Sequence, residues 1–123
     1  VLCVEDNPAN LRLIEALIAR VPGTTLLTSE DAKTGLGMAR ARVPDVILMD
    51  INLPGMDGFE ALAELKADPA TAAIPVIALS ANAMPADVER GRAAGFVRYL
   101  TKPINLDELL AALAVAVEDR AAR

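Results

Sequence analysis

The chain has 123 residues, of which 54% are apolar and 24% are charged, so it is expected to form a packed core rather than a disordered segment. A net charge of -5 argues against nucleic-acid binding, and no apolar stretch approaches the roughly 20 residues that cross a bilayer, which argues against membrane contact. The single cysteine, Cys3, excludes an internal disulfide and is typical of a reducing compartment such as the cytoplasm. The absence of histidine excludes histidine-based triads and zinc sites. The length favours one domain over residues 1–123.

Strand-like and helix-like runs alternate five times along the chain. The helices are expected to begin near Asn7, after Ser29, at Asp57, near Pro85 and at Asn105. The expected strands are residues 1–4, 25–28, 46–49, 76–79 and 97–100. This alternation predicts an α/β fold, a doubly wound five-stranded parallel sheet with helices on both faces, and the common strand order is 2-1-3-4-5.

Polar side chains follow four of these five strands. Glu5 and Asp6 follow the first strand, Asp50 follows the third, Ser80 the fourth and Lys102 the fifth. The carboxyl ends of parallel strands lie at one edge of a sheet, which is where such folds bind ligands. We therefore expect three carboxylates, a hydroxyl and an ammonium to meet at that edge.

The chemistry of this set is that of a divalent cation and a phosphoryl group. Carboxylates packed together repel one another, and a hard cation such as Mg²⁺ relieves that repulsion. A carboxylate is also a nucleophile that forms an aspartyl phosphate. Phosphoryl transfer then needs in-line positioning and neutralisation of the phosphoryl oxygens, which Mg²⁺, Lys102 and Ser80 would supply.

Four sequence motifs carry a family resemblance over essentially the whole chain. They are Val4-Glu5-Asp6-Asn7, the segment 48–58 (LMDINLPGMDG), Ala78-Leu79-Ser80-Ala81 and Tyr99-Leu100-Thr101-Lys102-Pro103. Ser80 follows Asp50 by 30 residues and Lys102 follows Ser80 by 22, spacings typical of the family. The chain resembles a response-regulator receiver domain of two-component signalling. Its segments 80–85 and 102–104 are similar to those of receivers from hybrid histidine kinases or stand-alone relay proteins.

The resemblance implies a flavodoxin-like fold and a role for each matched residue. Asp50 would accept the phosphoryl group, and Lys102 would contact it. Asp6 would bind Mg²⁺ directly, Glu5 would act through water, and the Asn52 carbonyl would be a further ligand beside Asp50. Ser80 and Tyr99 would form the switch pair that changes the surface of the fourth helix, fifth strand and fifth helix. The Lys102-Pro103 peptide bond is expected to be cis.

The resemblance implies phosphorelay signalling, in which a histidine kinase or a histidine phosphotransfer domain supplies the phosphoryl group. No separate substrate would be turned over, apart from self-phosphorylation and autodephosphorylation. One alternative is an aspartyl-nucleophile phosphatase, but the second Asp of its Asp-x-Asp pattern is replaced here by Asn52. A second alternative is an interaction domain that works without phosphorylation, against which the complete set of site residues argues.

Overall fold

A computed structural model describes residues 1–82 and 84–121, with the side chains of 118–121 excepted. Its five strands form one parallel sheet in the order β2-β1-β3-β4-β5, which confirms the predicted doubly wound topology. The elements are β1 (Leu2–Val4), α1 (Pro8–Ile18), β2 (Leu27–Ser29), α2 (Ala32–Arg42), β3 (Ile47–Asp50), α3 (Gly58–Ala67), β4 (Val76–Ser80), α4 (Pro85–Ala94), β5 (Arg98–Thr101) and α5 (Leu106–Ala121).

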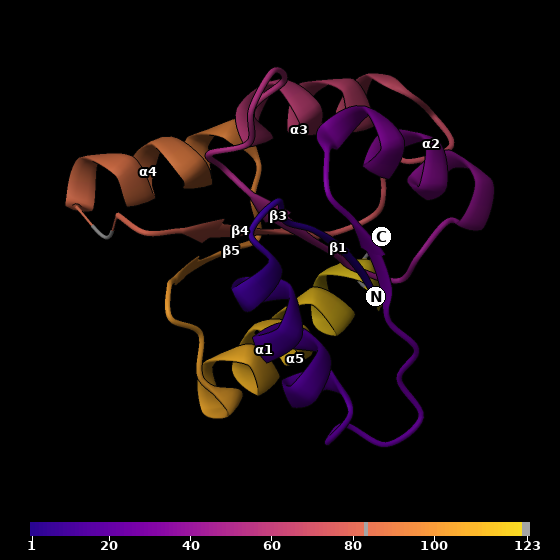
Figure 1. Cartoon of the computed structure of the whole chain (residues 1–123). Coiled ribbons are helices and arrows are strands. Elements are labelled where there is room, and N and C mark those ends of the chain that lie inside the picture. The colour runs from indigo at the N-terminus through magenta and orange to yellow at the C-terminus, as the bar shows by residue number, and fades with distance from the viewer. Residues whose placement is uncertain (83, 122–123) are drawn as a thin grey trace.

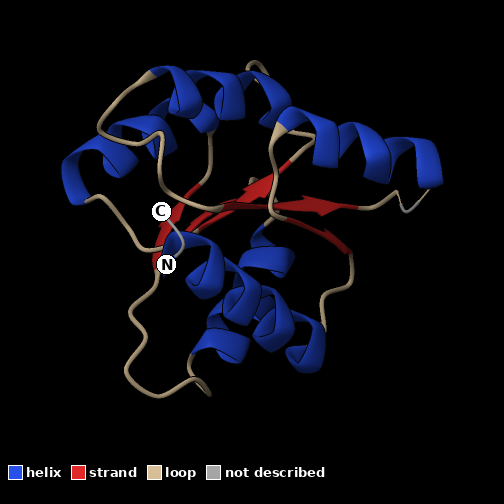
Figure 2. Ribbon diagram, turned by 180° about the vertical axis from the view of Figure 1, so that it is seen from behind, coloured by secondary structure: helices blue, strands red, loops and turns tan. Residues whose placement is uncertain are grey.

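Helices cover both faces of the sheet. Helices α1 and α5 lie on one face, and α2, α3 and α4 lie on the other (Figure 1). The view from behind in Figure 2 shows the same two layers with the sheet between them. Within the described residues, no helix combines the length and the apolar content that a bilayer-spanning segment requires.

Successive side chains of a strand point to opposite faces of the sheet. Because helices cover both faces, the central strands are buried on both sides. Ile47 and Met49 of β3 pack in the cluster that includes residues of α2 and α3. Leu48, between them, packs in the cluster that includes residues of α1 and α5. Cys3 lies in this second cluster and is fully buried, and burial raises the pKa of its thiol, as expected for a packing residue and not a reactive one.

Side-chain caps explain where three of the predicted helices begin. Asn7 Oδ1 accepts a hydrogen bond from Ala9 N at 2.9 Å. Asp57 Oδ1 accepts one from Glu60 N at 2.9 Å, and Asn105 Oδ1 accepts one from the backbone N–H three residues ahead at 2.8 Å. These bonds satisfy amide donors that have no partner inside the helix, and they fix where α1, α3 and α5 start.

The predicted limits of the second strand were wrong. It was expected at residues 25–28, whereas β2 is Leu27–Ser29. The reason is the pairing: β1 has three residues, and its Leu2 lies opposite Leu27, so the ladder extends from there to Ser29. The limits of the other strands differ from the prediction by at most one residue, and Asp50 is the last residue of β3 instead of the first residue after it.

Candidate phosphoacceptor site

Three carboxylates meet at the carboxyl edge of the sheet, as the sequence predicted. Glu5 and Asp6 follow β1, and Asp50 ends the neighbouring strand β3. One carboxylate oxygen from each of the three lies within 4.8 Å of the others. Glu5 and Asp50 are buried, with 0% and 2% of their surface exposed, whereas Asp6 is exposed. Two buried carboxylates beside a third are costly unless cations neutralise them.

Lys102 supplies one such cation from the position directly after the edge strand β5. Its Nζ lies 2.8 Å from Glu5 Oε2 and 3.1 Å from Asp50 Oδ2. Its backbone N–H donates to the Ser80 carbonyl at 2.8 Å, which fixes the start of the loop after β5, and the Lys102-Pro103 peptide bond is cis. Burial alone would lower the pKa of Lys102, but the two carboxylates outweigh it and raise the pKa. Lys102 therefore remains an ammonium at neutral pH.

The pKa of the Asp50 carboxylate is also raised, but here burial is a cause of the increase and does not oppose it. Burial is the largest cause and raises it, and the neighbouring Glu5 raises it further. The Asn52 N–H, which donates to Asp50 Oδ1 at 3.0 Å, and the Lys102 ammonium both lower it, but they do not compensate fully. The site thus places the Asp50 carboxylate where additional positive charge would be favourable.

The carboxylate oxygens of the site suit a hard divalent cation as ligands. Glu5 Oε1 accepts from Asn7 N at 3.1 Å and from Asn10 Nδ2 at 3.4 Å. Glu5 Oε2 is buried and, among the described residues, receives no hydrogen bond of ordinary geometry, although Lys102 pairs with its charge. Asp6 faces solvent beside it. This all-oxygen set with excess negative charge fits a cation that prefers carboxylate and carbonyl ligands and keeps part of its water.

Ser80 and Tyr99 are linked through one residue, Asn82. The Ser80 hydroxyl is buried and accepts a hydrogen bond from Asn82 N at 3.1 Å. The Tyr99 hydroxyl donates to the Asn82 carbonyl at 2.8 Å. Asn82 Oδ1 in turn accepts from Met84 N at 3.0 Å, just before α4 begins. The hydroxyl at the site, the tyrosine on β5 and the start of α4 therefore share one hydrogen-bonded loop.

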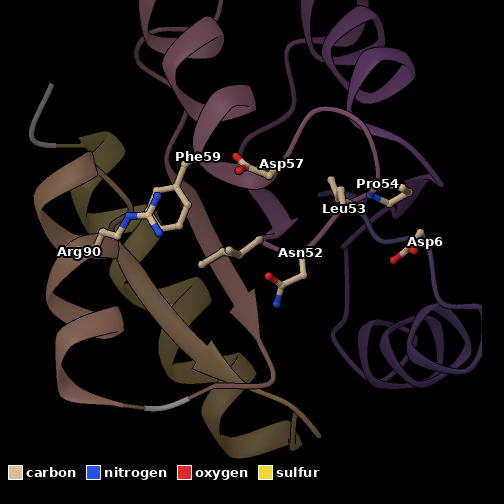
Figure 3. A pocket seen from close by; sticks show the side chains of 8 residues that line it. Asp6, Asn52, Leu53, Pro54, Asp57, Phe59 and Arg90 are labelled. Atoms are coloured by element: carbon tan, nitrogen blue, oxygen red, sulfur yellow. The ribbon is translucent and has the colours of Figure 1, made fainter.

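An open pocket of about 470 Å³ adjoins the acidic cluster. In Figure 3, Asp6 lies at one end of it, Asn52 lies in the middle, and Arg90 and Phe59 lie at the other end. The Arg90 guanidinium is stacked on the Phe59 ring, 4.0 Å from its centroid. The pocket thus combines carboxylates and a guanidinium within one concave surface.

Comparison with known proteins is consistent with this geometry. The family model of the response regulator receiver domain matches residues 1–114. The chain belongs to the response regulator receiver family. It is 37% identical over 110 residues to Protein PilH of Pseudomonas aeruginosa, covering 89% of this chain and 90% of PilH. It is 41% identical over 105 residues to the response regulator PleD of Caulobacter vibrioides, covering 85% of this chain but 23% of PleD.

A solved structure shows the same likeness in three dimensions. The receiver domain of the sensor histidine kinase PA1611 of Pseudomonas aeruginosa, solved with a magnesium ion in its active-site cleft, has a TM-score of 0.86 and 37% identity, with 95% of each chain covered. Family membership makes this chain a phosphorelay signal-transduction module of two-component systems. Receivers are phosphoacceptors and not enzymes with a separate substrate, so the phosphatase alternative is not supported.

Sequence reasoning missed several neighbours of the predicted residues. It gave Asn10 and Asn82 no role, although Asn10 contacts Glu5 and Asn82 links Ser80 to Tyr99. It also missed the stack of Arg90 on Phe59. The position of Asn82 two residues before Met84 was a usable signal, because an asparagine side chain often accepts a hydrogen bond from the backbone N–H two residues ahead and so forms an Asx turn. No local pattern relates Arg90 to a residue 31 positions earlier.

Proposed function

We propose that Asp50 is the phosphoacceptor of this receiver and takes the phosphoryl group from a phosphohistidine on a histidine kinase or phosphotransfer protein. The observation that carries the proposal is the position of the Lys102 ammonium, 2.8 Å from Glu5 Oε2 and 3.1 Å from Asp50 Oδ2, at the end of a buried strand. Of the three carboxylates, Asp50 alone both ends a strand and contacts Lys102. We propose that residues 1–123 act as one receiver unit in the cytoplasm.

Mg²⁺ is the cation that these ligands fit best. Asp6, Asp50 and the Asn52 carbonyl would bind it, and Glu5 would act through water. When bound, the ion would supply positive charge to the phosphoryl oxygens and lower the repulsion among the carboxylates. Lys102 holds Asp50 in place and offers its ammonium to the incoming phosphoryl group. The same site would release the group to water, which makes autodephosphorylation part of the proposal.

The switch that follows phosphorylation is proposed to run through Ser80 and Tyr99. A phosphoryl group on Asp50 is a strong hydrogen-bond acceptor and would attract the Ser80 hydroxyl. That hydroxyl accepts from Asn82 N, whose residue also binds the Tyr99 hydroxyl, so a shift of Ser80 reaches Tyr99 and α4. A difference of a few kcal/mol between two arrangements is enough for phosphorylation to change their populations. The surface of α4, β5 and α5 would change in response.

The proposal is tested by finding where the phosphoryl group is attached. The protein is incubated with acetyl phosphate and Mg²⁺, the acyl phosphate is trapped with hydroxylamine, and the digested peptides are mapped by mass spectrometry. The modification should lie at Asp50. Trapping at another carboxylate, with Asp50 unmodified, would refute the assignment.

A further inference from the structure

The pocket beside the acidic cluster contains a cation that the proposed phosphotransfer does not use. Arg90 projects from α4 into this pocket, and its guanidinium lies over the Phe59 ring (Figure 3). Among the described residues it takes part in no salt bridge, in contrast to Arg40 and Arg92, which pair with carboxylates. The guanidinium therefore keeps its charge and its donors available.

Phe59 holds the guanidinium in one place. Its ring is half-buried and meets the Phe96 ring edge-on, with a centroid distance of 5.6 Å and an interplanar angle of 79°. A ring fixed in this way offers Arg90 a rigid face, and the negative face of an aromatic ring attracts a cation. Arg90 is thus preorganised although it is exposed.

The two ends of the pocket carry opposite charges. Asp6 lies at the end next to the acidic cluster, and Arg90 lies at the opposite end. Asn52 and Asp57 lie between them, and Asp57 Oδ1 accepts a hydrogen bond from Glu60 N. The pocket adjoins Asp50 through Asp6, which belongs to the same acidic cluster, and through Asn52, whose N–H donates to Asp50 Oδ1. A donor whose phosphoryl group is at Asp50 can therefore extend its remaining part over this pocket. Negative charge on that part would be repelled near Asp6 and attracted near Arg90.

We propose that this pocket is a leaving-group subsite for small acyl phosphates, and that Arg90 attracts the carboxylate that departs. The inference rests on Asp50 being the phosphoacceptor. In the reaction, an Asp50 carboxylate oxygen forms a bond to phosphorus, and the bond between phosphorus and the acyl oxygen breaks. The electron pair leaves with that oxygen as a carboxylate anion, so no proton is required. Negative charge grows on the leaving group during the step, and Arg90 favours that growth.

A donor with a neutral leaving group provides the comparison. In phosphoramidate the bond from phosphorus to a protonated nitrogen breaks, and the nitrogen leaves with the electron pair as ammonia. Because the nitrogen carries positive charge until that bond breaks, Arg90 repels it and does not favour this donor. A small donor is favoured over a protein side chain as the occupant because the pocket, about 470 Å³, has the size of a small-molecule site.

The experiment measures the rate of phosphorylation of wild type and Arg90→Gln with acetyl phosphate and with phosphoramidate, both with Mg²⁺, by intact-mass spectrometry. Arg90→Gln should slow phosphorylation by acetyl phosphate about two- to fivefold more than phosphorylation by phosphoramidate, which is the range for an exposed charge contact. Higher salt should reduce the difference. Phe59→Leu should also slow the reaction with acetyl phosphate more than the reaction with phosphoramidate. In the double variant with Arg90→Gln it should add little to the effect of Arg90→Gln alone.

Arg92→Gln is the matched control, because it removes the same charge from the same helix but Arg92 pairs with Glu89 and does not line the pocket. It should leave the ratio of the two rates unchanged. Equal slowing with both donors, no slowing with either, or the same ratio in Arg92→Gln as in Arg90→Gln would overturn the subsite. Failure of wild type to react with either donor would instead overturn the phosphoacceptor assignment, and the subsite with it.

Discussion

Gly58 is the residue at which one methyl group should disturb both the fold and the site. It is the first residue of α3, and its N–H donates to the Ile51 carbonyl at 2.9 Å, which closes the loop after Asp50. A Cβ at this position would lie 2.6 Å from the Asp50 carbonyl oxygen and 2.7 Å from Ile51 Cα. Both are backbone atoms of the loop that carries the candidate nucleophile. They have little freedom to move without displacing it.

The size of the effect follows from two opposing terms. Overpacking a well-packed position costs about 1–3 kcal/mol. Replacing a helical glycine with alanine stabilises by about 0.5–1 kcal/mol, and less at the first turn. Gly58→Ala should therefore lower the free energy of unfolding by about 1–2 kcal/mol. For a chain of this length that corresponds to a fall in Tm of roughly 4–8 °C.

The assay is thermal and denaturant unfolding of Gly58→Ala beside Gly37→Ala. Gly37 is also in a helix, α2, but a Cβ there would meet nothing within 4 Å, so its substitution should stabilise by roughly 0.5–1 kcal/mol. Gly58→Ala should also react more slowly with acetyl phosphate, because the Asp50 backbone is displaced. The reasoning is refuted if Gly58→Ala is as stable as Gly37→Ala and reacts at the wild-type rate.

Three further predictions concern a strained turn, the charge of the site and the switch. Val43 is the C-cap of α2 and has a left-handed φ of 42°, a costly conformation for a β-branched residue. Val43→Gly should therefore raise the free energy of unfolding by about 0.5–1 kcal/mol, measured in urea. A lower free energy of unfolding would contradict the strain at this position. Burial raises the pKa of Asp50, so the protonated carboxyl contributes to the stability of the native state. This contribution to the free energy of unfolding is complete below the unfolded-state pKa of about 3.9, and it is lost as the pH rises through the native pKa. Metal-free Asp50→Asn should consequently gain stability relative to wild type as the pH rises from about 4 to neutrality, and parallel pH profiles would count against a destabilising charge. Beryllofluoride with Mg²⁺ should change the ring NMR signals of Tyr99, the single tyrosine, in wild type and much less in Ser80→Ala; an unchanged spectrum in wild type would exclude the switch.

Features that depend only on residues close together in the sequence were predictable. Asn7, Asp57 and Asn105 each cap a helix because a side-chain oxygen reaches the backbone two or three residues ahead, which depends on nearby residues alone. The alternation of strands and helices gave the strand order, and the position of polar residues after strands placed Glu5 and Asp50 at one edge.

Features that depend on contacts between distant segments were not predictable in the same way. The extent of β2 follows from its pairing with the short strand β1 and not from its own composition. The stack of Arg90 on Phe59 joins α4 to α3, and no periodicity relates the two residues. The left-handed conformation of Val43 was unexpected, because a β-branched residue gives no local signal for it.

The most direct test of the account is the stoichiometry of phosphorylation at Asp50. Wild type, Asp50→Asn and Asp57→Asn are treated with acetyl phosphate and Mg²⁺ and examined by intact-mass spectrometry. Asp57 is the matched control because it lies at the end of the loop that follows Asp50, lines the adjoining pocket and caps α3, a role that asparagine also fills. Wild type and Asp57→Asn should each gain one phosphoryl group, and Asp50→Asn should gain none. Phosphorylation of Asp50→Asn at the wild-type level would contradict the central claim.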